Sequence, residues 1–332
     1  MQLLVRTGHG GQLIKGVGHL KAVGLTDFGG PEALEMLELP DPVAGPGQLL
    51  IRVHAAAVNP TDALIRSGTH VKMFGRTAPP PYVPGMDAAG VLMAIGEDIE
   101  TDLKVGDHVM AFIAPNGSYG AYSEMLAVPA NSVVKAPKGM SHVEACTILM
   151  NAMTARVALD TLALKPGSTV LISGAAGTFG GYAVQLAKED GLMVVADASE
   201  ADEDAVAGFG ADLVLRRGDD LAERVRERFP DGVDGAIDGA LFNERLAPAV
   251  RDGGTVITLR MQAGEADRGV KLIPVRSKLH SEERDKLDGL GRLAEEGKLT
   301  IRVVGTYPKE EASEAHRRLE QGGLRGRIVL EF

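Results

Sequence analysis

The sequence predicts an α/β protein in which a doubly wound parallel sheet accompanies a second, β-rich domain. Its 332 residues exceed what one ordinary hydrophobic core accommodates, so two domains are expected and a single small module is excluded. From about residue 141, apolar strands alternate with amphipathic helices, which indicates right-handed βαβ crossovers and a sheet covered on both faces. Before that point, short strands separated by Gly/Pro turns indicate an irregular β-rich region.

Strands of the first region are expected between Lys21 and Lys135. They read KAVGL, LEMLEL, QLLIRVHAAAV, AAGVLMAIG, GDHVMAFIA and YSEMLAV. The turns between them, which include GGPE, PVAGPG and PNGSYG, supply positive φ or the fixed φ of proline. Residues 1–20 are Gly-rich without clear periodicity, and we expect them to form an N-terminal extension outside the fold.

The second region opens with a helical stretch over residues 141–163. Strands and helices then alternate in the order STVLIS, TFGGYAVQLAKED, LMVVAD, EADEDAVAGFG, ADLVL, DLAERVRERF, VDGAID, NERLAPAV and GTVITL. From about residue 281 the chain adds a long helix, the strand LTIRVV, the helix EEASEAHRRLEQGG and the final strand RGRIVLEF. This order is typical of a nucleotide-binding sheet.

Composition excludes several classes of protein. The formal net charge is −10 without a Lys/Arg-dense stripe, so neither nucleic acid nor an anionic membrane is an expected partner. No apolar run approaches the length of a membrane span. The one cysteine, Cys146, excludes an intramolecular disulfide and a cysteine-based zinc cage. We therefore expect a cytoplasmic protein that acts on a small-molecule substrate.

A glycine loop, SGAAGTFGGYAVQLAK, is the sharpest motif, because it follows an apolar strand directly and opens a helix. Gly174 and Gly177 allow the backbone to turn and to approach a pyrophosphate, and Gly180 allows the helix to pack closely on the strand. The backbone amides that open the helix lie at its positive end. The residues expected to bind the cofactor are Gly174, Ala175, Ala176, Gly177, Thr178, Phe179 and Gly180.

Several further motifs occur together with this loop: VHAAAVNPTD, PGMDAAGV, KVGDHVMAF, GADLV and LRGRIVL. In this order they resemble the medium-chain dehydrogenase/reductase superfamily, and more narrowly its zinc-independent quinone oxidoreductase and enoyl reductase branch. The resemblance runs from Lys21 to Phe332. It implies a GroES-like catalytic domain of residues 21–145 and 276–332, a Rossmann cofactor-binding domain of residues 146–275, and a homodimer.

The same resemblance predicts that no metal is bound. The positions that match the zinc ligands of the superfamily's alcohol dehydrogenases hold Asn59, Met86, Asp87 and Met150. Amide, thioether and a single carboxylate make an implausible tetrahedral zinc site.

The choice of nicotinamide cofactor depends on strand register. Asp197, about 20 residues after the loop, could bind the ribose of NAD, but the acid of NAD-dependent relatives would match Ala198. NADPH-dependent relatives carry a lysine near Asp202, where this chain has an acidic run. Arg217 matches a phosphate-contacting position, and with Ser199 it could bind a 2′-phosphate. We expect NADPH, and NADH stays open.

Without a metal, the expected chemistry is hydride transfer to a conjugated substrate, a quinone or an α,β-unsaturated carbonyl compound. The resemblance implies that Asn59 and Thr154 lie at the nicotinamide, both as catalytic and as cofactor-binding residues. Leu64, with Met86 and Met150, would line the substrate pocket. Because Leu64 replaces a tyrosine that donates a proton in some relatives, the proton donor stays open between water, Tyr119 and Tyr122. The alternative function is a nucleotide-binding structural or regulatory protein with little turnover.

Overall fold

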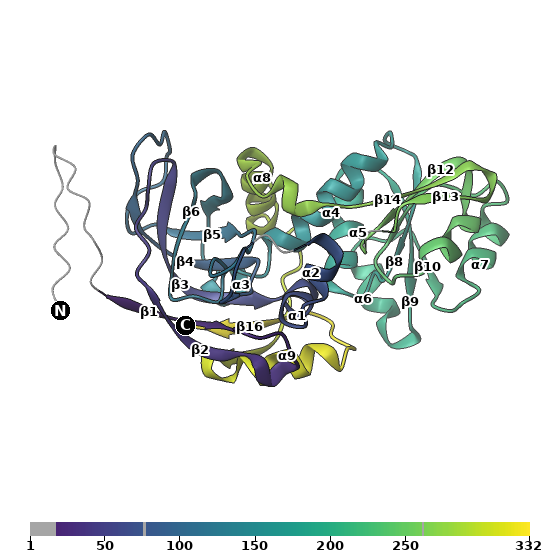
Figure 1. Ribbon diagram of the computed structural model, residues 1–332. Coiled ribbons are helices and arrows are strands. Elements are labelled where there is room, and N and C mark those ends of the chain that lie inside the picture. Colours follow the sequence, from purple (N-terminus) through teal and green to yellow (C-terminus); the bar gives the residue numbers. More distant parts are fainter. Residues whose placement is uncertain (1–17, 76–77, 261) are drawn as a thin grey trace.

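The computed structural model describes residues 18–75, 78–260 and 262–332, and it contains two seven-stranded sheets at opposite ends of the molecule (Figure 1). Most of the predicted extension, residues 1–17, lies outside the described residues. The first strand, β1 (His19–Gly24), begins two residues before the expected boundary. No helix in the described ranges is long and apolar enough to cross a bilayer.

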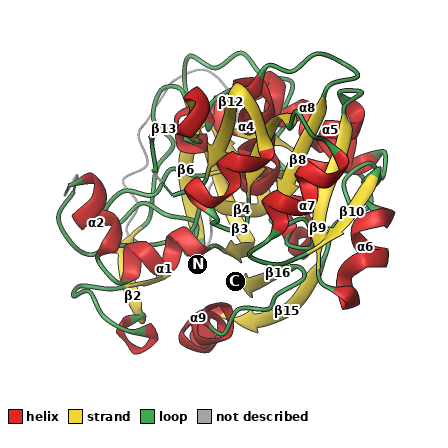
Figure 2. Ribbon diagram, turned by 90° about the vertical axis from the view of Figure 1, so that its right-hand side faces the viewer, coloured by secondary structure: helices red, strands yellow, loops and turns green. Residues whose placement is uncertain are grey.

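The β-rich sheet is built from both ends of the chain. Its order is β15-β16-β3-β4-β5-β7, with β6 also paired to β3. The C-terminal strand β16 pairs antiparallel with β3, so the last residues complete the sheet that the first third of the chain begins (Figure 2). The strands are β3 (Gln48–Val58), β4 (Asp87–Ile95), β5 (His108–Phe112), β6 (Met125–Pro129), β7 (Val133–Lys135), β15 (Val303–Pro308) and β16 (Arg327–Glu331).

Smaller elements surround this sheet. The strand β1 pairs antiparallel with β2 (Glu35–Pro40) in a separate ribbon. The helices beside this sheet include α1 (Pro60–Arg66), α2 (Thr69–Phe74) and α9 (Ala312–Glu320). The sequence reading missed β7, which is only three residues long.

The second sheet has the order β10-β9-β8-β11-β12-β14-β13, and its pairs are parallel except for the antiparallel edge strand β13. The predicted doubly wound parallel sheet is therefore confirmed, with helices on both of its faces (Figures 1 and 2). The strands are β8 (Thr169–Ser173), β9 (Met193–Ala198), β10 (Leu213–Arg216), β11 (Val233–Asp238), β12 (Val250–Thr258), β13 (Gly264–Ala266) and β14 (Val270–Pro274).

The helices that accompany this sheet are α5 (Thr178–Glu189), α6 (Glu203–Gly208) and α7 (Leu221–Arg228), and α8 (Arg284–Glu295) follows it. The expected helix NERLAPAV is instead a 3₁₀-helix, Asn243–Ala249, with Pro248 inside it. Proline has no amide hydrogen to donate, which disfavours a regular α-helix there. The sequence reading also missed the paired strands β13 and β14.

The expected helical stretch 141–163 is two helices, α3 (His142–Ala145) and α4 (Leu149–Leu162). The amide of Met150 in the first turn of α4 donates to the Asp87 carboxylate at 2.8 Å, so the break is fixed by a tertiary contact. Apolar side chains of α4 belong to one hydrophobic cluster with Phe112 of one sheet and Ile172 of the other. Because α4 packs on both halves, it holds their facing edges in place.

Candidate functional site

The glycine loop connects β8 to α5 at the carboxyl edge of the parallel sheet. Gly174 has φ +71°, and a Cβ there would lie 2.7 Å from the carbonyl carbon of Gly239. A Cβ on Gly180 would lie 2.2 Å from the oxygen of Gly174. At both positions a Cβ would collide with backbone atoms of a neighbouring segment. These two positions therefore require glycine for the loop to form.

Gly177 differs from these two glycines. It caps α5 with φ −73° and ψ 169°, conformations open to any residue, and no side chain caps the helix. A Cβ at Gly177 would meet only the oxygen of Gly174, at 3.3 Å. The first-turn amides of α5 have no intrahelical acceptor, and the helix dipole favours an anion there. We call Gly177 and these first-turn amides of α5 the cradle. The cradle fits the pyrophosphate of a dinucleotide.

The other predicted loop residues surround that cradle. Ala175 and Ala176 are buried beneath it, while Thr178 and Phe179 are half-buried in the first turn of α5. Their expected contacts with a cofactor remain predictions.

The segment after β11 lies against this loop, and the sequence reading missed it. The Asp238 carboxylate accepts hydrogen bonds from the Ser173 hydroxyl at 2.7 Å and from the backbone N–H of Asn243 at 2.6 Å. Leu241 and Asn243 have φ values of +62° and +58°, an uncommon conformation outside glycine. The Asn243 Oδ1 atom is buried without a hydrogen-bond partner. An unpaired acceptor on strained backbone is typical of a ligand site.

At the expected adenosine end, the structure pairs two residues that are alternative signals for NAD and NADPH in the sequence. Asp197 is fully buried near the end of β9, and its Oδ1 accepts from the Gly174 amide at 2.6 Å. Arg217 donates to both carboxylate oxygens, from Nε at 2.8 Å and from Nη2 at 3.2 Å. The hydrogen bond to Asp197 raises the pKa of Arg217. About a third of the Arg217 side chain, 35%, is exposed, so it borders the site while Asp197 lies behind it.

Two arginines from the C-terminal segment also reach this end of the parallel sheet, and sequence reasoning missed both. Arg302 donates to the carbonyls of Ala176 and Gly177, each at 3.0 Å, and lies 4.7 Å over the ring of Phe209. Arg325 donates to the Asp202 carboxylate at 2.6 and 2.7 Å. No local pattern could identify them, because more than 120 residues separate each arginine from its partner.

The expected nicotinamide end contains a buried polar network. The Asn59 amide donates to the Ala57 carbonyl at 3.2 Å and to Asp87 Oδ2 at 3.1 Å, and its oxygen accepts from Arg327 at 2.7 Å. Asp87 also accepts from the Met150 amide, and Arg327 lies 3.3 Å from it. Burial raises the pKa of Asp87, and the Arg327 charge opposes that shift.

This network bears on the metal question. A guanidinium cation lies against Asn59 and Asp87, two of the four positions that match zinc ligands in the superfamily's alcohol dehydrogenases. Both hydrogens of the Asn59 amide are already donated, so a second acceptor position on its oxygen is what remains for a ligand. In the described part of the chain, no group of three or more His, Cys, Asp or Glu side chains could hold a metal ion.

Thr154 and Met150 lie one helical turn apart on α4. The Thr154 hydroxyl donates to the Met150 carbonyl at 2.6 Å, which leaves its oxygen free to accept a hydrogen bond. Met86 and Met150 are 5% and 8% exposed, and Leu64 is half-buried on α1. The structure therefore brings Asn59, Met86 and Met150 together around Asp87, whereas Leu64 lies on α1.

Tyr122 is one of the open candidates for proton donor, but its hydroxyl already has two partners within the β-rich half. Its hydroxyl is fully buried between Asp62 Oδ2 at 3.1 Å and His316 Nε2 at 3.2 Å. Burial and the Asp62 charge raise its pKa well above the ordinary value for tyrosine. A proton on this hydroxyl is therefore held inside the β-rich half.

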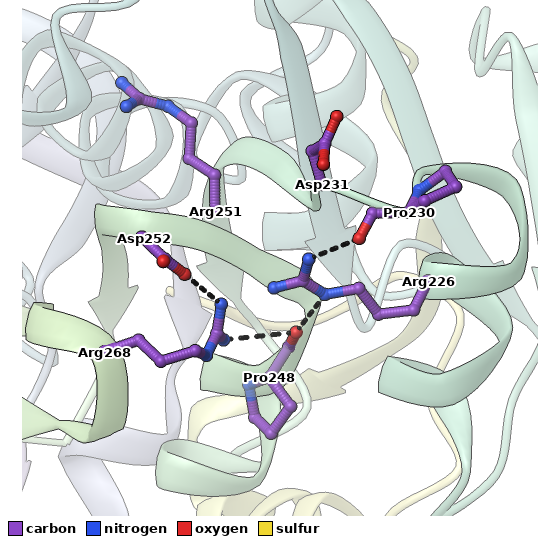
Figure 3. Close-up of a pocket in the computed structure, with 7 residues that line it drawn as sticks. All are labelled: Arg226, Pro230, Asp231, Pro248, Arg251, Asp252 and Arg268. Atoms are coloured by element: carbon purple, nitrogen blue, oxygen red, sulfur yellow. Dashed lines mark hydrogen bonds and ion pairs between the residues drawn. The ribbon is translucent and has the colours of Figure 1, made fainter.

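Two hollows lie away from the glycine loop. One, beside the first residues of β11 and β12, is lined by Arg226, Arg251 and Arg268, and two of these arginines donate to a backbone carbonyl (Figure 3). Arg226 and Arg268 both donate to the Pro248 carbonyl, and Arg268 also pairs with Asp252. This hollow lies at the amino edge of the sheet, opposite the edge where such sheets bind ligands. A smaller cavity beside α1 is lined by Phe28, Ile65 and Tyr82, among other residues.

The fold and the loop define a two-part, dinucleotide-binding protein of the dehydrogenase class. Residues 45–138 match the alcohol dehydrogenase GroES-like domain, and residues 209–330 match the zinc-binding dehydrogenase family. A quinone oxidoreductase of Sus scrofa is 31% identical, over 94% of this chain and 97% of its own length. A 2-methylene-furan-3-one reductase of Solanum lycopersicum is 30% identical, over 94% of this chain and 79% of its own.

Among solved structures, a mycobacterial protein in complex with NADPH superposes with a TM-score of 0.80 at 28% identity, covering 94% of this chain and all of that one. The chain therefore belongs to the medium-chain dehydrogenase/reductase superfamily, in its quinone oxidoreductase branch, as its motifs predicted.

Proposed function

We propose that this protein is a zinc-independent oxidoreductase that uses NADPH to reduce a quinone or an α,β-unsaturated carbonyl compound. The observation that carries the proposal is the uncapped cradle at Gly177 beside the Asp197–Arg217 pair. The relatives named as a quinone oxidoreductase and a 2-methylene-furan-3-one reductase support this substrate class. A relative named as an NADPH-dependent alkenal/one oxidoreductase, 28% identical, supports the cofactor.

When bound, a reduced nicotinamide would supply a hydride to an electron-poor carbon of the substrate, and the residues of this chain would orient it and exclude water. Arg327 and Asp87 fix the side chain of Asn59, and the Oδ1 atom of Asn59 keeps one lone pair that can accept a hydrogen bond. Thr154 presents a hydroxyl oxygen with its hydrogen directed to Met150. Both groups can accept a hydrogen bond from a carboxamide. Met86 and Met150 exclude water, and Leu64 forms an apolar wall of the substrate pocket.

Zinc has no role in this proposal. The Arg327 guanidinium already neutralises the Asp87 carboxylate, and a divalent cation there would face a fixed positive charge. Because an enolate or hydroquinone anion is easier to stabilise than a simple alkoxide, hydrogen bonds can replace the metal.

The test is oxidation of NADPH with a panel of quinones and enones, repeated with NADH. Turnover of at least one conjugated substrate, with simple ketones inert, is the expected result. The absence of turnover across the panel, with intact NADPH binding, would favour a structural or regulatory role instead.

Three broader expectations belong to the same proposal. The catalytic domain consists of residues 21–145 and 276–332 and the cofactor domain of residues 146–275. Two copies form a homodimer, since β13 ends the parallel sheet with an unpaired edge. The protein works in the cytoplasm, where a single buried thiol such as Cys146 stays reduced. Light scattering and cell fractionation test the last two.

A further inference from the structure

The acidic turn after β9 contains a carboxylate in an unusual position. Asp202 ends the 3₁₀ turn Glu200–Asp202, which Ser199 caps, and its side chain is only 11% exposed. The Ser199 hydroxyl donates to Asp202 Oδ2 at 2.5 Å. Arg325 donates to both carboxylate oxygens, at 2.6 and 2.7 Å. Mainly through Arg325, the pKa of Asp202 falls to about 2, so this carboxylate is charged at any working pH.

These donors are the set that a phosphate group would use. A planar guanidinium fork and a hydroxyl are what proteins offer to a phosphate monoester. The turn follows the end of β9, the second strand of the nucleotide-binding sheet, where such proteins contact the 2′ position of the adenosine ribose. Arg217 is close enough for the charges of Asp202 and Arg325 to affect its pKa. Asp202 therefore holds the groups that a 2′-phosphate would need.

Two neutral ion pairs lie at the end of β9. Two guanidinium groups, Arg217 and Arg325, are each paired with one carboxylate, Asp197 and Asp202. A 2′-phosphate that approached Arg217 would meet two guanidinium groups that are already paired with carboxylates and a hydroxyl already donated to Asp202. A ribose with a free 2′-hydroxyl would meet no such competition.

We propose that Asp202 is a specificity-determining residue, an internal substitute for the 2′-phosphate that competes with NADPH for Ser199 and Arg325. The inference rests on the proposed function only in taking the glycine loop as a dinucleotide site. It implies that the protein discriminates weakly between NADPH and NADH, and that removal of one charge shifts the balance toward NADPH.

The experiment compares wild-type protein with Asp202→Asn, which keeps the shape of the side chain and removes its charge. Asp204→Asn is the matched control, because Asp204 is exposed in the same acidic run. The ligands are 2′,5′-ADP and 5′-AMP, titrated by calorimetry, since neither carries a nicotinamide. We expect Asp202→Asn to raise the ratio of affinities in favour of 2′,5′-ADP by at least about five-fold. The control should leave the ratio unchanged.

An unchanged ratio in Asp202→Asn, or a ratio shifted toward 5′-AMP, would overturn the proposal. A second variant, Arg325→Gln, decides the matter if the first does not fold. It leaves the charge of Asp202 unpaired, so the ratio should fall by at least about five-fold, and no change would contradict the proposal. These titrations do not involve turnover. A failed quinone and enone assay would therefore refute the proposed function and leave this inference standing.

Discussion

Replacing Gly177 by valine should separate folding from cofactor binding. The backbone at this position, φ −73° and ψ 169°, suits a β-branched residue. A new Cβ would meet one atom, the oxygen of Gly174 at 3.3 Å, which a shift of a few tenths of an ångström relieves. We therefore expect the free energy of unfolding to change by less than about 1 kcal/mol, partly because glycine also costs entropy in the unfolded chain.

Binding should suffer far more than stability. The valine side chain would fill the space in front of the first-turn amides of α5, where the pyrophosphate is expected. Each charge-assisted hydrogen bond lost is worth about 1.5–3 kcal/mol, so the loss of two weakens NADPH binding by about 3–6 kcal/mol. Cofactor fluorescence titration measures this loss, and urea unfolding measures the stability of the same preparation.

Gly180→Ala is the contrasting variant. Its Cβ would lie 2.2 Å from the same Gly174 oxygen, which would have to move much further than in Gly177→Val and would disturb the loop. We expect it to lose about 1–3 kcal/mol of stability, as in other overpacked sites. Wild-type affinity for NADPH in Gly177→Val would refute the assignment of the cradle. A loss of stability larger in Gly177→Val than in Gly180→Ala would refute the packing argument.

Three further predictions follow from individual side chains. Arg217→Ala should weaken NADPH binding by about 1.5–3 kcal/mol and barely change NADH binding. Equal losses of affinity for both cofactors in paired titrations would show that the arginine merely supports Asp197. Metal analysis should find no stoichiometric zinc, and prolonged chelation should leave activity intact, because Arg327 already lies against Asn59 and Asp87; one tightly held zinc per chain would contradict this. Burial lowers the pKa of His316 to about 3, so the folded state resists its protonation and stability should fall as the pH drops below about 6.5. Between pH 6.5 and 5 this histidine lowers the free energy of unfolding by about 2 kcal/mol. Urea titrations of His316→Gln should not show this decrease. Parallel pH profiles for the two proteins would argue against a buried neutral imidazole.

Local patterns of sequence were sufficient to predict the parallel sheet and its glycine loop. The alternation after residue 141 predicted a parallel sheet, and the glycine spacing in SGAAGTFGG predicted a strand–loop–helix junction, because both depend on neighbouring residues. The predictions of secondary structure were wrong where a strand is very short or where a tertiary contact overrides the local pattern. Strands β7 and β13 have three residues each, and the break between α3 and α4 depends on the contact between Met150 and Asp87.

What the sequence determined by itself is the class of protein: the order of strands and helices after residue 141 and the loop that opens α5. These follow from residue types and short spacings. What only the tertiary structure decided is how the charged groups pair. Asp197 and Arg217 read as rival signals for two cofactors, yet they form one ion pair. Arg325 reaches Asp202, and Arg327 reaches Asn59, across 123 and 268 residues. The sequence specifies the charge of each side chain. The partner of that charge depends on which distant segments come together in the fold, and a charge that is already paired is less available to a ligand.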